Sequence, residues 1–401
     1  PFVVPQYPSK GAMKTISGDK DDKKLATIPV PGDVAIIEYF EPYAVHGQGV
    51  LEIGKIGHDY RGFFKIANEK DFNSSGSCNN NVVCPEGDDW EDQINSVAMS
   101  IIGTTRWCSG AMVANTGNDN TPYYLTADHC IDGQDPTTWV FIFNYKSSVC
   151  NPSSDGSISE SVSGCVVRGN RANTDFALLE LSSVPPASYN VFYSGWDNSD
   201  DLPTTQVGIH HPAGDVMKIS FDEEASTKQT FQGVSSWEIA SWNDGTTEGG
   251  SSGSPLYDQN KRIIGQLYGG FASCNSDTED YYGRFGLSWD GSSATTRLKD
   301  WLDPSNTGNA THNGYYINSL SVTENVSKEI QLDVYPNPSN GVFNLISDIQ
   351  IDKVEVLDLS GKLVYSNLKK GQTIINLEAL KVGFYLVKIN KNTVKKIQLL
   401  K

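Results

Sequence analysis

The stretch Gly249-Gly250-Ser251-Ser252-Gly253-Ser254-Pro255-Leu256 is the one around which we expect the chain to be organised. It follows a polar, turn-rich segment at 243–248 and precedes an apolar, strand-like segment at 263–270. Glycines beside a serine allow unusual backbone angles and let a ligand approach the main chain closely. The stretch therefore indicates either a reactive serine on a sharp turn or an ordinary flexible Gly/Ser loop.

Two stretches upstream favour the reactive serine. The apolar segment 124–127 leads into His129, and Asp175 stands at the start of the apolar segment 176–181. Histidine titrates near neutral pH and can take a serine proton, while a buried aspartate fixes the histidine tautomer. Taken singly, such a histidine would be interpreted as a structural residue, and such an aspartate as the cap of a turn. Together with Ser252, they predict a base, an orienting acid and a nucleophile.

Composition limits the classes of function. The 401 residues predict two or three domains. With 31 Lys+Arg against 48 Asp+Glu, the net charge is −17, so we expect no nucleic-acid partner. No apolar run is long enough to predict a membrane-spanning helix. The chain begins with Pro1 and shows no signal-peptide pattern, so we expect a fragment or an already trimmed precursor.

The two ends of the chain differ from its middle. Residues 330–401 hold 10 Lys and 6 acidic residues, a net of +4, whereas the rest of the chain has a net of −21. Alternating apolar residues there predict a small β-sandwich, preceded by a polar linker at 309–329. Residues 1–70 contain no cysteine and no catalytic candidate. With strand-like segments that include 50–53 and 62–66, they are expected to be the C-terminal part of a pro-region.

Seven cysteines lie between positions 78 and 274, and none forms a Cys-x-x-Cys pair. This usage disfavours zinc or thioredoxin chemistry and favours about three disulfides formed in an oxidising compartment. Cys108 and Cys130 flank a strand–turn–strand segment next to His129. A bridge between them would anchor the base and could stabilise the fold by roughly 3 kcal/mol in the chain-entropy model.

Short strand-like segments recur through residues 71–308, among them 96–102, 108–113 and 138–145. Regular short strands separated by Gly, Asn and Asp turns predict an all-β double β-barrel. The segment 294–302 has helical spacing of its apolar residues, so a short C-terminal helix is expected to close this domain.

Two motifs resemble those of chymotrypsin-like serine proteases. TADHC at 126–130 resembles TAAHC, GSSGSP at 250–255 resembles GDSGGP, and the order His, Asp, Ser is that of chymotrypsin. Ser251 stands where trypsin-type zymogens carry the aspartate that pairs with a new N-terminus. The resemblance therefore implies that activation works differently in this chain.

Further motifs make residues 71–308 resemble the bacterial lysyl endopeptidase family. These motifs are GSC at 76–78, VCPEG at 83–87, IHHP at 209–212 and WLDP at 301–304. The resemblance implies His129 as base, Asp175 as orienting acid and Ser252 as nucleophile. It also implies an oxyanion hole made by the N–H groups of Gly250 and Ser252. The implied disulfides, which leave Cys165 outside them, are Cys78–Cys274, Cys84–Cys150 and Cys108–Cys130.

The resemblance also bears on specificity. Trypsin-like enzymes place an aspartate six residues before the serine, where this chain has Thr246. The lysyl endopeptidases use an aspartate before a Tyr-Gly-Arg segment, which Asp280 matches here. A buried carboxylate there would select lysine over the longer, forked guanidinium of arginine. The alternative is that Asp280 is a solvated loop acid. Tyr268 and Gly269 are expected to pair with the substrate backbone, although the family has a histidine in place of Tyr268.

Three other features complete the expectations. His210 and His211 are interpreted as packing residues. A lysine-specific enzyme could cut its own pro-region at Lys70–Asp71.

The motifs YPNPSNG at 335–341 and GFYLVKI at 383–389 resemble the C-terminal sorting domains of the type IX secretion system. That resemblance implies export through the outer-membrane secretion machinery, with a generic adhesive or carbohydrate-binding module as the alternative.

The sequence thus predicts a secreted or cell-surface serine endopeptidase that cleaves protein and peptide substrates after lysine. We expect it to act as a monomer without a cofactor, and with no metal, since no HExxH or EF-hand pattern is present. Two alternatives remain open. One is a protease of the same fold with another preference, and the other is a catalytically inactive surface adhesin or binding protein.

Overall fold

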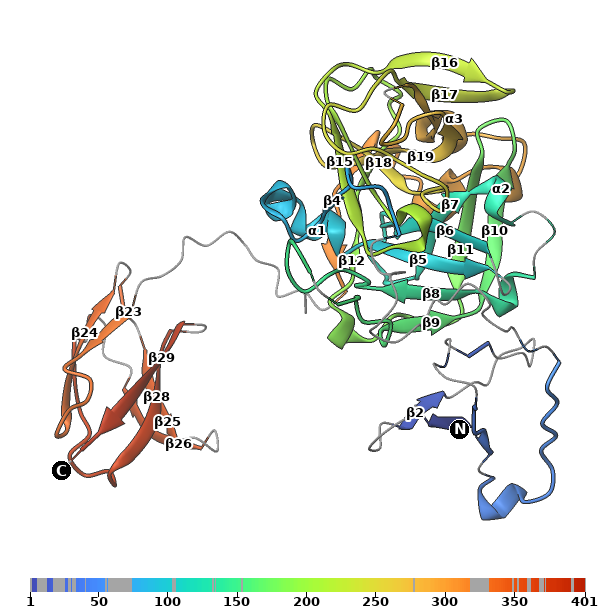
Figure 1. Cartoon of the computed structure of the whole chain (residues 1–401). Helices are drawn as coiled ribbons and strands as arrows, with labels where there is room; N and C mark the ends of the chain where they lie inside the picture. The colour runs from blue at the N-terminus through green and yellow to red at the C-terminus, as the bar shows by residue number, and fades with distance from the viewer. Residues whose placement is uncertain are drawn as a thin grey trace. The chain divides into compact units, whose positions relative to one another are not determined.

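The structure is a computed structural model and divides into two units, Pro1–Leu320 and Ser321–Lys401, each described here by itself (Figure 1). It describes the residues in these ranges: 2–5, 13–16, 26–27, 30, 34–39, 41–54, 56, 74–102, 106–131, 133, 135–152, 154–276, 278–317, 332–347, 350–351, 353–358, 362–367, 371, 373–390 and 393–400. Lys70, Asp71 and the strand-like segment at 62–66 lie outside these residues.

The first unit contains a seven-stranded antiparallel sheet with the order β10-β11-β7-β6-β5-β8-β9. Its strands are β5 Val97–Ile102, β6 Arg106–Met112, β7 Tyr123–Ala127, β8 Val140–Phe143, β9 Ser161–Ser163, β10 Cys165–Arg171 and β11 Phe176–Leu181. The strands that the sequence predicts at 96–102, 108–113 and 138–145 are therefore present, with ends shifted by a few residues.

A second, ten-stranded sheet has the main order β16-β17-β20-β19-β18-β14-β15-β4, with β13 and β21 attached beside β19. Its strands are β4 Asn80–Asn81, β13 Trp196–Asp197, β14 Gln206–His210, β15 Lys218–Asp222, β16 Thr227–Phe231, β17 Val234–Ile239, β18 Pro255–Asp258, β19 Ile263–Gly270, β20 Asp280–Arg284 and β21 Thr311–His312. β12 Phe192–Tyr193 and β22 Tyr315–Tyr316 form a separate pair. Figure 1 shows the strands β5–β11 and the strands β15–β19 as two separate groups.

Alternate residues of the first sheet enter different cores, because successive side chains of a strand point to opposite faces. Val97 and Leu125 pack in a cluster that also contains Ile209 of the second sheet. Their chain neighbours Ala98 and Tyr124 pack in another cluster, which is built largely from the first sheet. Both faces of these strands are thus buried, as expected for a barrel that packs against a second one, and the predicted chymotrypsin-like all-β class is confirmed.

Helices are short in this unit. They are α1 Glu91–Ile94, α2 Asp128–Ile131, α3 Phe285–Trp289 and α4 Lys299–Leu302. The helix expected over 294–302 is wrong in its extent: a 3-10 turn, η6 Ala294–Thr296, precedes α4, and Arg297 between them is extended, with φ −150°. The extended residue places Leu298 in the core, where it is fully buried.

The N-terminal residues form a small sheet of β1 Phe2–Pro5, β2 Met13–Ile16 and β3 Glu38–Tyr39, in the order β2-β1-β3. The expected strand at 50–53 is not formed. Val50 and Ile53 are 90% and 59% exposed, so they contribute little to a core against which a strand could pack.

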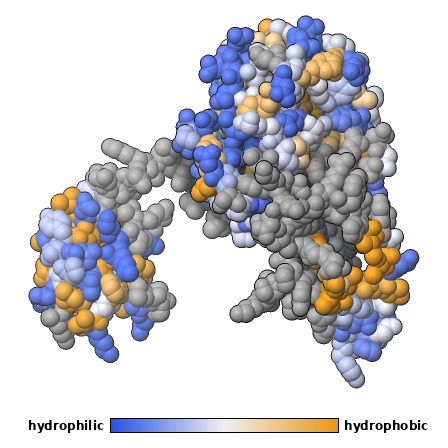
Figure 2. Space-filling view, viewed as in Figure 1, coloured by the Kyte–Doolittle hydropathy of each residue, from blue (hydrophilic) through white to orange (hydrophobic). Residues whose placement is uncertain are grey.

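The second unit is a β-sandwich of two antiparallel sheets, as predicted. One sheet contains β23 Leu332–Tyr335, β24 Val342–Ser347 and β27 Ile374–Asn376, and the other contains β25 Val354–Asp358, β26 Leu363–Asn367, β28 Gly383–Ile389 and β29 Thr393–Leu399. Phe343 and Leu345 of the first sheet share one core with Val356 and Val387 of the second. Figure 2 shows apolar side chains among polar ones on the visible surface of this unit. No helix among the described residues is long and apolar enough to cross a membrane.

Candidate active site

Strand pairing brings His129 and Asp175 together. β7 ends at Ala127, and the one-turn helix α2, which contains His129, follows it at once. β11 begins at Phe176, which pairs with Ala127. Because the two strands are antiparallel, the residue before β11 lies beside the residues after β7. The main chain adds a hydrogen bond, since Asp128 N–H donates to the Asp175 carbonyl at 2.8 Å.

The Asp175 carboxylate binds His129 through both of its oxygens. Its Oδ2 lies 2.9 Å from His129 Nδ1, and its Oδ1 accepts from the His129 main-chain N–H at 3.0 Å. Asp175 is only 2% exposed and adopts φ +52°, which aspartate tolerates better than most residues. Burial raises the pKa of the Asp175 carboxyl, although the bonds to His129 oppose that shift. With Nδ1 engaged by the carboxylate, a proton taken from a nucleophile would go to Nε2.

The turn that carries Ser252 packs against the end of β7. Gly253 adopts φ +80°, and a Cβ there would lie 2.6 Å from Ser109 O and 2.7 Å from Ala127 N. Only glycine fits so close to the segment that leads into His129. Ser109 N–H also donates to the Ser252 carbonyl at 2.8 Å. The structure therefore brings all three predicted residues, His129, Asp175 and Ser252, to one place.

The disulfides are Cys78–Cys274, Cys84–Cys150 and Cys108–Cys130, the three that the family resemblance implies. Cys108–Cys130 joins β6 to the helix that carries His129. Cys108 precedes Ser109, whose N–H binds the Ser252 carbonyl. The bridge therefore links the helix of His129 to the segment that binds Ser252. Cys165 is buried, takes no part in a disulfide, and its thiol donates to the Pro136 carbonyl.

The sulfur atoms of Cys108 and Cys130 lie close to the His129 ring, in a group with the composition of a metal site. Both sulfurs are joined in the disulfide, so they offer no thiolate to an ion. This group therefore does not fit a bound metal.

Asp280 begins β20 and is 1% exposed, so it is not a solvated loop acid. Its Oδ2 accepts from Trp242 Nε1 at 2.8 Å and from Thr247 Oγ1 at 2.7 Å. Its Oδ1 faces Gly270, where a Cβ would collide with it. Burial raises the pKa of the Asp280 carboxyl, against the effect of these hydrogen bonds. Trp242 and Thr247 were not predicted from the sequence, although Thr247 lies only five residues before Ser252.

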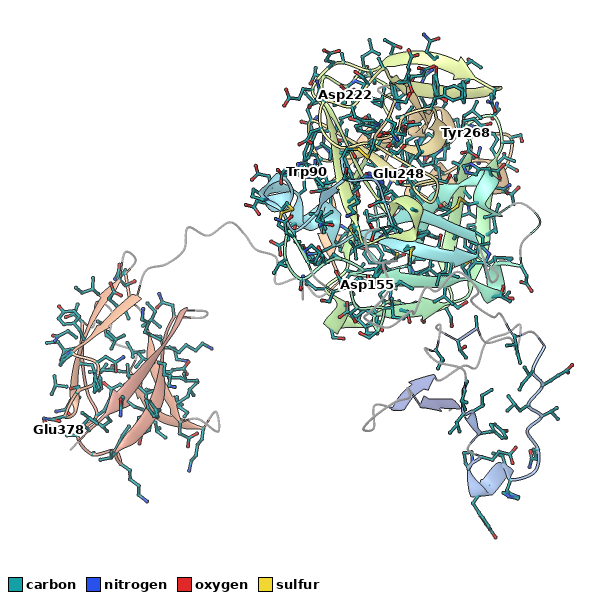
Figure 3. The ribbon with its side chains drawn as sticks, in the orientation of Figure 1. Trp90, Asp155, Asp222, Glu248, Tyr268 and Glu378 are labelled. Carbon is teal, nitrogen blue, oxygen red and sulfur yellow. A yellow bond between two sulfur atoms is a disulfide. The ribbon has the colours of Figure 1, made fainter. Side chains whose placement is uncertain are left out.

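Aromatic rings connect the base to this acidic position. The Tyr268 ring lies edge-on to His129, with centroids 5.7 Å apart, and also edge-on to Phe231, at 6.0 Å. Phe231 stacks on Tyr281, at 4.1 Å, beside Asp280 in β20. Figure 3 labels Tyr268 and also Glu248, which belongs to the loop before Ser252. Tyr268 and Gly269 thus lie on β19 between His129 and the strand of Asp280, where an extended peptide could pair.

His210 and His211 are fully buried, as expected of packing residues. Burial lowers their pKa values to about 3 and about 4. His211 Nδ1 lies 3.0 Å from the Asp215 carbonyl, and its ring stacks on Tyr145. His210 instead contacts Ser251, the residue before the candidate nucleophile, which the sequence did not reveal.

Comparison with known proteins gives two family matches. Residues 72–283 match the family described as "Lysyl endopeptidase, C-terminal domain", and residues 333–400 match the "Secretion system C-terminal sorting domain". A lysyl endopeptidase of Pseudomonas aeruginosa is 28% identical over 279 residues, which cover 64% of this chain and 60% of the relative. The chain thus spans about three fifths of the length of the curated relative it matches.

Solved structures with some likeness include two proteases. The thermostable serine protease AL20, from an extremophilic microorganism, is 16% identical with a TM-score of 0.38, over 49% of this chain and 94% of that chain. A Glu endopeptidase in complex with MPD is 17% identical with a TM-score of 0.35, over 48% of this chain and 86% of that chain.

Proposed function

The chain belongs to the lysyl endopeptidase family, and on that premise we propose that it is a serine endopeptidase that cleaves after lysine. Ser252 attacks the scissile carbonyl, and His129 takes the serine proton and later returns it to the leaving amine. Asp175 holds the histidine tautomer and stabilises its charged form. The main-chain N–H groups of Gly250 and Ser252 bind the developing oxyanion. Water then releases the acyl group.

The observation that carries lysine specificity is the buried carboxylate of Asp280. One of its oxygens is held by Trp242 and Thr247, while the other faces Gly270 of the strand expected to bind the peptide. A lysine ammonium is a compact point charge that can reach such an oxygen at the bottom of a narrow site. Removing one partner of a buried charge pair costs about 2–5 kcal/mol.

The sorting-domain match makes the chain a secreted or cell-surface protein. In this scheme residues 330–401 engage the secretion machinery, residues 1–70 are the end of a pro-region, and the enzyme removes that region by cutting Lys70–Asp71. Substrates are proteins and peptides.

Kinetics on matched peptides test the specificity. The full chain is assayed on peptides with Lys, Arg, Glu or Leu before the scissile bond. Asp280→Asn is expected to lower kcat/KM for the lysine peptide by roughly 30- to 5,000-fold, the range set by the cost of an unpaired charge. Glu279→Gln, which changes the neighbouring acid, is the matched control and should keep the wild-type preference. Equal losses in both variants, or a wild-type preference for another residue, would refute the assignment of Asp280.

A further inference from the structure

We propose that His210 is a positioning residue: through Ser251 it holds the loop that carries Ser252, so that the N–H groups of Gly250 and Ser252 face the substrate oxygen. This proposal rests on the function proposed above and deepens it. His210 touches no reacting atom in this scheme and acts only through its neighbour in the loop.

A closed chain of hydrogen bonds supports this role. Glu248 N–H donates to Ser251 Oγ at 3.2 Å, and Ser251 Oγ lies 2.8 Å from His210 Nδ1. On the other side of the ring, His210 Nε2 lies 3.1 Å from Ser220 Oγ, which donates to the Thr246 carbonyl at 2.8 Å. The chain of bonds therefore leaves the loop at Glu248 and Ser251 and returns to the same loop at Thr246.

Only one direction of donation satisfies every group. The single Ser220 proton goes to the Thr246 carbonyl, so His210 Nε2–H must donate to Ser220. His210 Nδ1 then accepts the Ser251 hydroxyl proton, and Ser251 Oγ accepts from Glu248 N–H. The arrangement needs a neutral imidazole with its proton on Nε2, since a charged ring would place two donors against Ser220 and Ser251.

The surroundings of His210 keep it neutral. His210, Ser220 and Ser251 have no exposed surface, and burial disfavours a charged ring. Lys218, which pairs with His210 across β14 and β15, and the adjacent His211 oppose a second positive charge there. No chain terminus takes part in the network, whereas a trypsin-type aspartate at position 251 would need a charged partner. The loop can therefore be held without a new N-terminus.

The loop needs such support because its backbone is unusual on both sides of Ser252. Gly250 adopts φ +100° and Gly253 adopts φ +80°. Glycine reaches such angles easily but also populates many others, so the glycines alone do not fix the conformation of the loop. A second link holds the other end, where Ser109 Oγ donates to the Gly250 carbonyl at 3.0 Å. His210 fixes Ser251 and Ser109 fixes Gly250, so both residues before the nucleophile are held from outside the loop.

Kinetics of two serine variants test the role. In Ser251→Ala and Ser220→Ala, each of which breaks one end of the network, kcat on a peptidyl-lysine substrate should fall about 10- to 100-fold, somewhat less than loss of an oxyanion donor outright. KM should stay within about twofold, because Asp280 is untouched. Rates are expressed per active site titrated with a fluorophosphonate, so that misfolded protein does not count.

Ser96→Ala is the matched control. Ser96 is equally buried and binds Tyr257 and the Gln93 carbonyl, but none of its hydrogen bonds reaches the loop. It should lower Tm while kcat per site stays at the wild-type value. If Ser251→Ala behaves as this control does, His210 has no positioning role, and the proposed lysyl endopeptidase activity still stands.

A spectroscopic readout tests the network independently of proteolysis. In the full chain with Ser252→Ala and ¹⁵N-labelled histidine, one histidine should show the neutral Nε2–H form from pH 8 down to pH 5. Its signals should vanish in His210→Gln, and its Nδ1 signal should shift in Ser251→Ala. A charged ring or a proton on Nδ1 would overturn the proposal whatever the kinetics show. A wild-type chain that the fluorophosphonate does not label would overturn the proposed function, and this positioning role with it.

Discussion

In the proposed function, the carboxylate of Asp280 selects the substrate at the expense of stability. Burial raises its pKa, which means that the folded protein binds a proton there more tightly than the unfolded chain does. The stabilising effect of this carboxyl is therefore complete below its ordinary pKa and is lost as the pH rises through the raised pKa. Above the raised pKa, the buried carboxylate destabilises the free enzyme, and in the proposed function a bound lysine would offset that cost.

The variant Asp280→Asn is accordingly expected to gain stability as it loses activity. The neutral amide does not carry the cost of a buried charge, so Tm at pH 8 should rise by a few degrees. The gain should shrink as the pH falls through the raised pKa, because the wild-type carboxyl then takes up a proton. Thermal unfolding of both proteins at several pH values measures this. A variant that is less stable than wild type at pH 8 would show that the bonds to Trp242 and Thr247 outweigh the charge.

At the scale of elements, the antiparallel pair β7–β11 positions two residues of the candidate site. It places His129 and Asp175 after and before adjacent strands, and the Cys108–Cys130 bridge then joins β6 to α2. The bridge closes a loop of 22 residues in sequence separation. Because Ser109, beside Cys108, binds the Ser252 carbonyl, this disulfide restrains His129 and Ser252 together.

Removing this bridge should therefore affect catalysis as well as stability. Replacing Cys108 and Cys130 by alanine is expected to lower the free energy of unfolding by roughly 3 kcal/mol, the chain-entropy value for such a loop. Activity per titrated site should also fall. The matched control replaces Cys84 and Cys150, whose bridge joins neither β6 nor α2. Equal activity per site in the two double variants would contradict the link between disulfide and site.

The sequence predicts an element or a site residue well where the residues that decide it are neighbours in the chain. It fails where a contact partner lies far away in the sequence. His129, Asp175 and Ser252 stand at strand ends and glycine turns, so their neighbours in the chain reveal them. Trp242 becomes a partner of Asp280 because β17 pairs with β20, and the two residues lie 38 positions apart in the sequence. The broken helix at 294–302 has the same cause, because burial of Leu298 overrides the helical spacing of the segment.

At the scale of the whole molecule, the chain joins two units with separate cores. The first encloses the candidate site between its two sheets, and the second is a sandwich with its own cluster of buried side chains. Composition already separated them, since the positive C-terminal module differs from the acidic remainder. The boundary at Leu320–Ser321 falls within the linker predicted at 309–329. The first residues of that segment instead belong to the first unit, because β21 and β22 pair with its strands and Tyr315 packs against its core.

The most direct test of the account is the set of bonds that the full chain cuts in a mixed proteome, read by mass spectrometry. Wild type should cut almost only after lysine, including its own Lys70–Asp71 bond, and Ser252→Ala should lose on the order of 10⁴–10⁶ in rate. Cuts after another residue would keep the nucleophile but contradict lysine selection by Asp280. An absence of cuts by wild type would contradict the proposed enzyme itself.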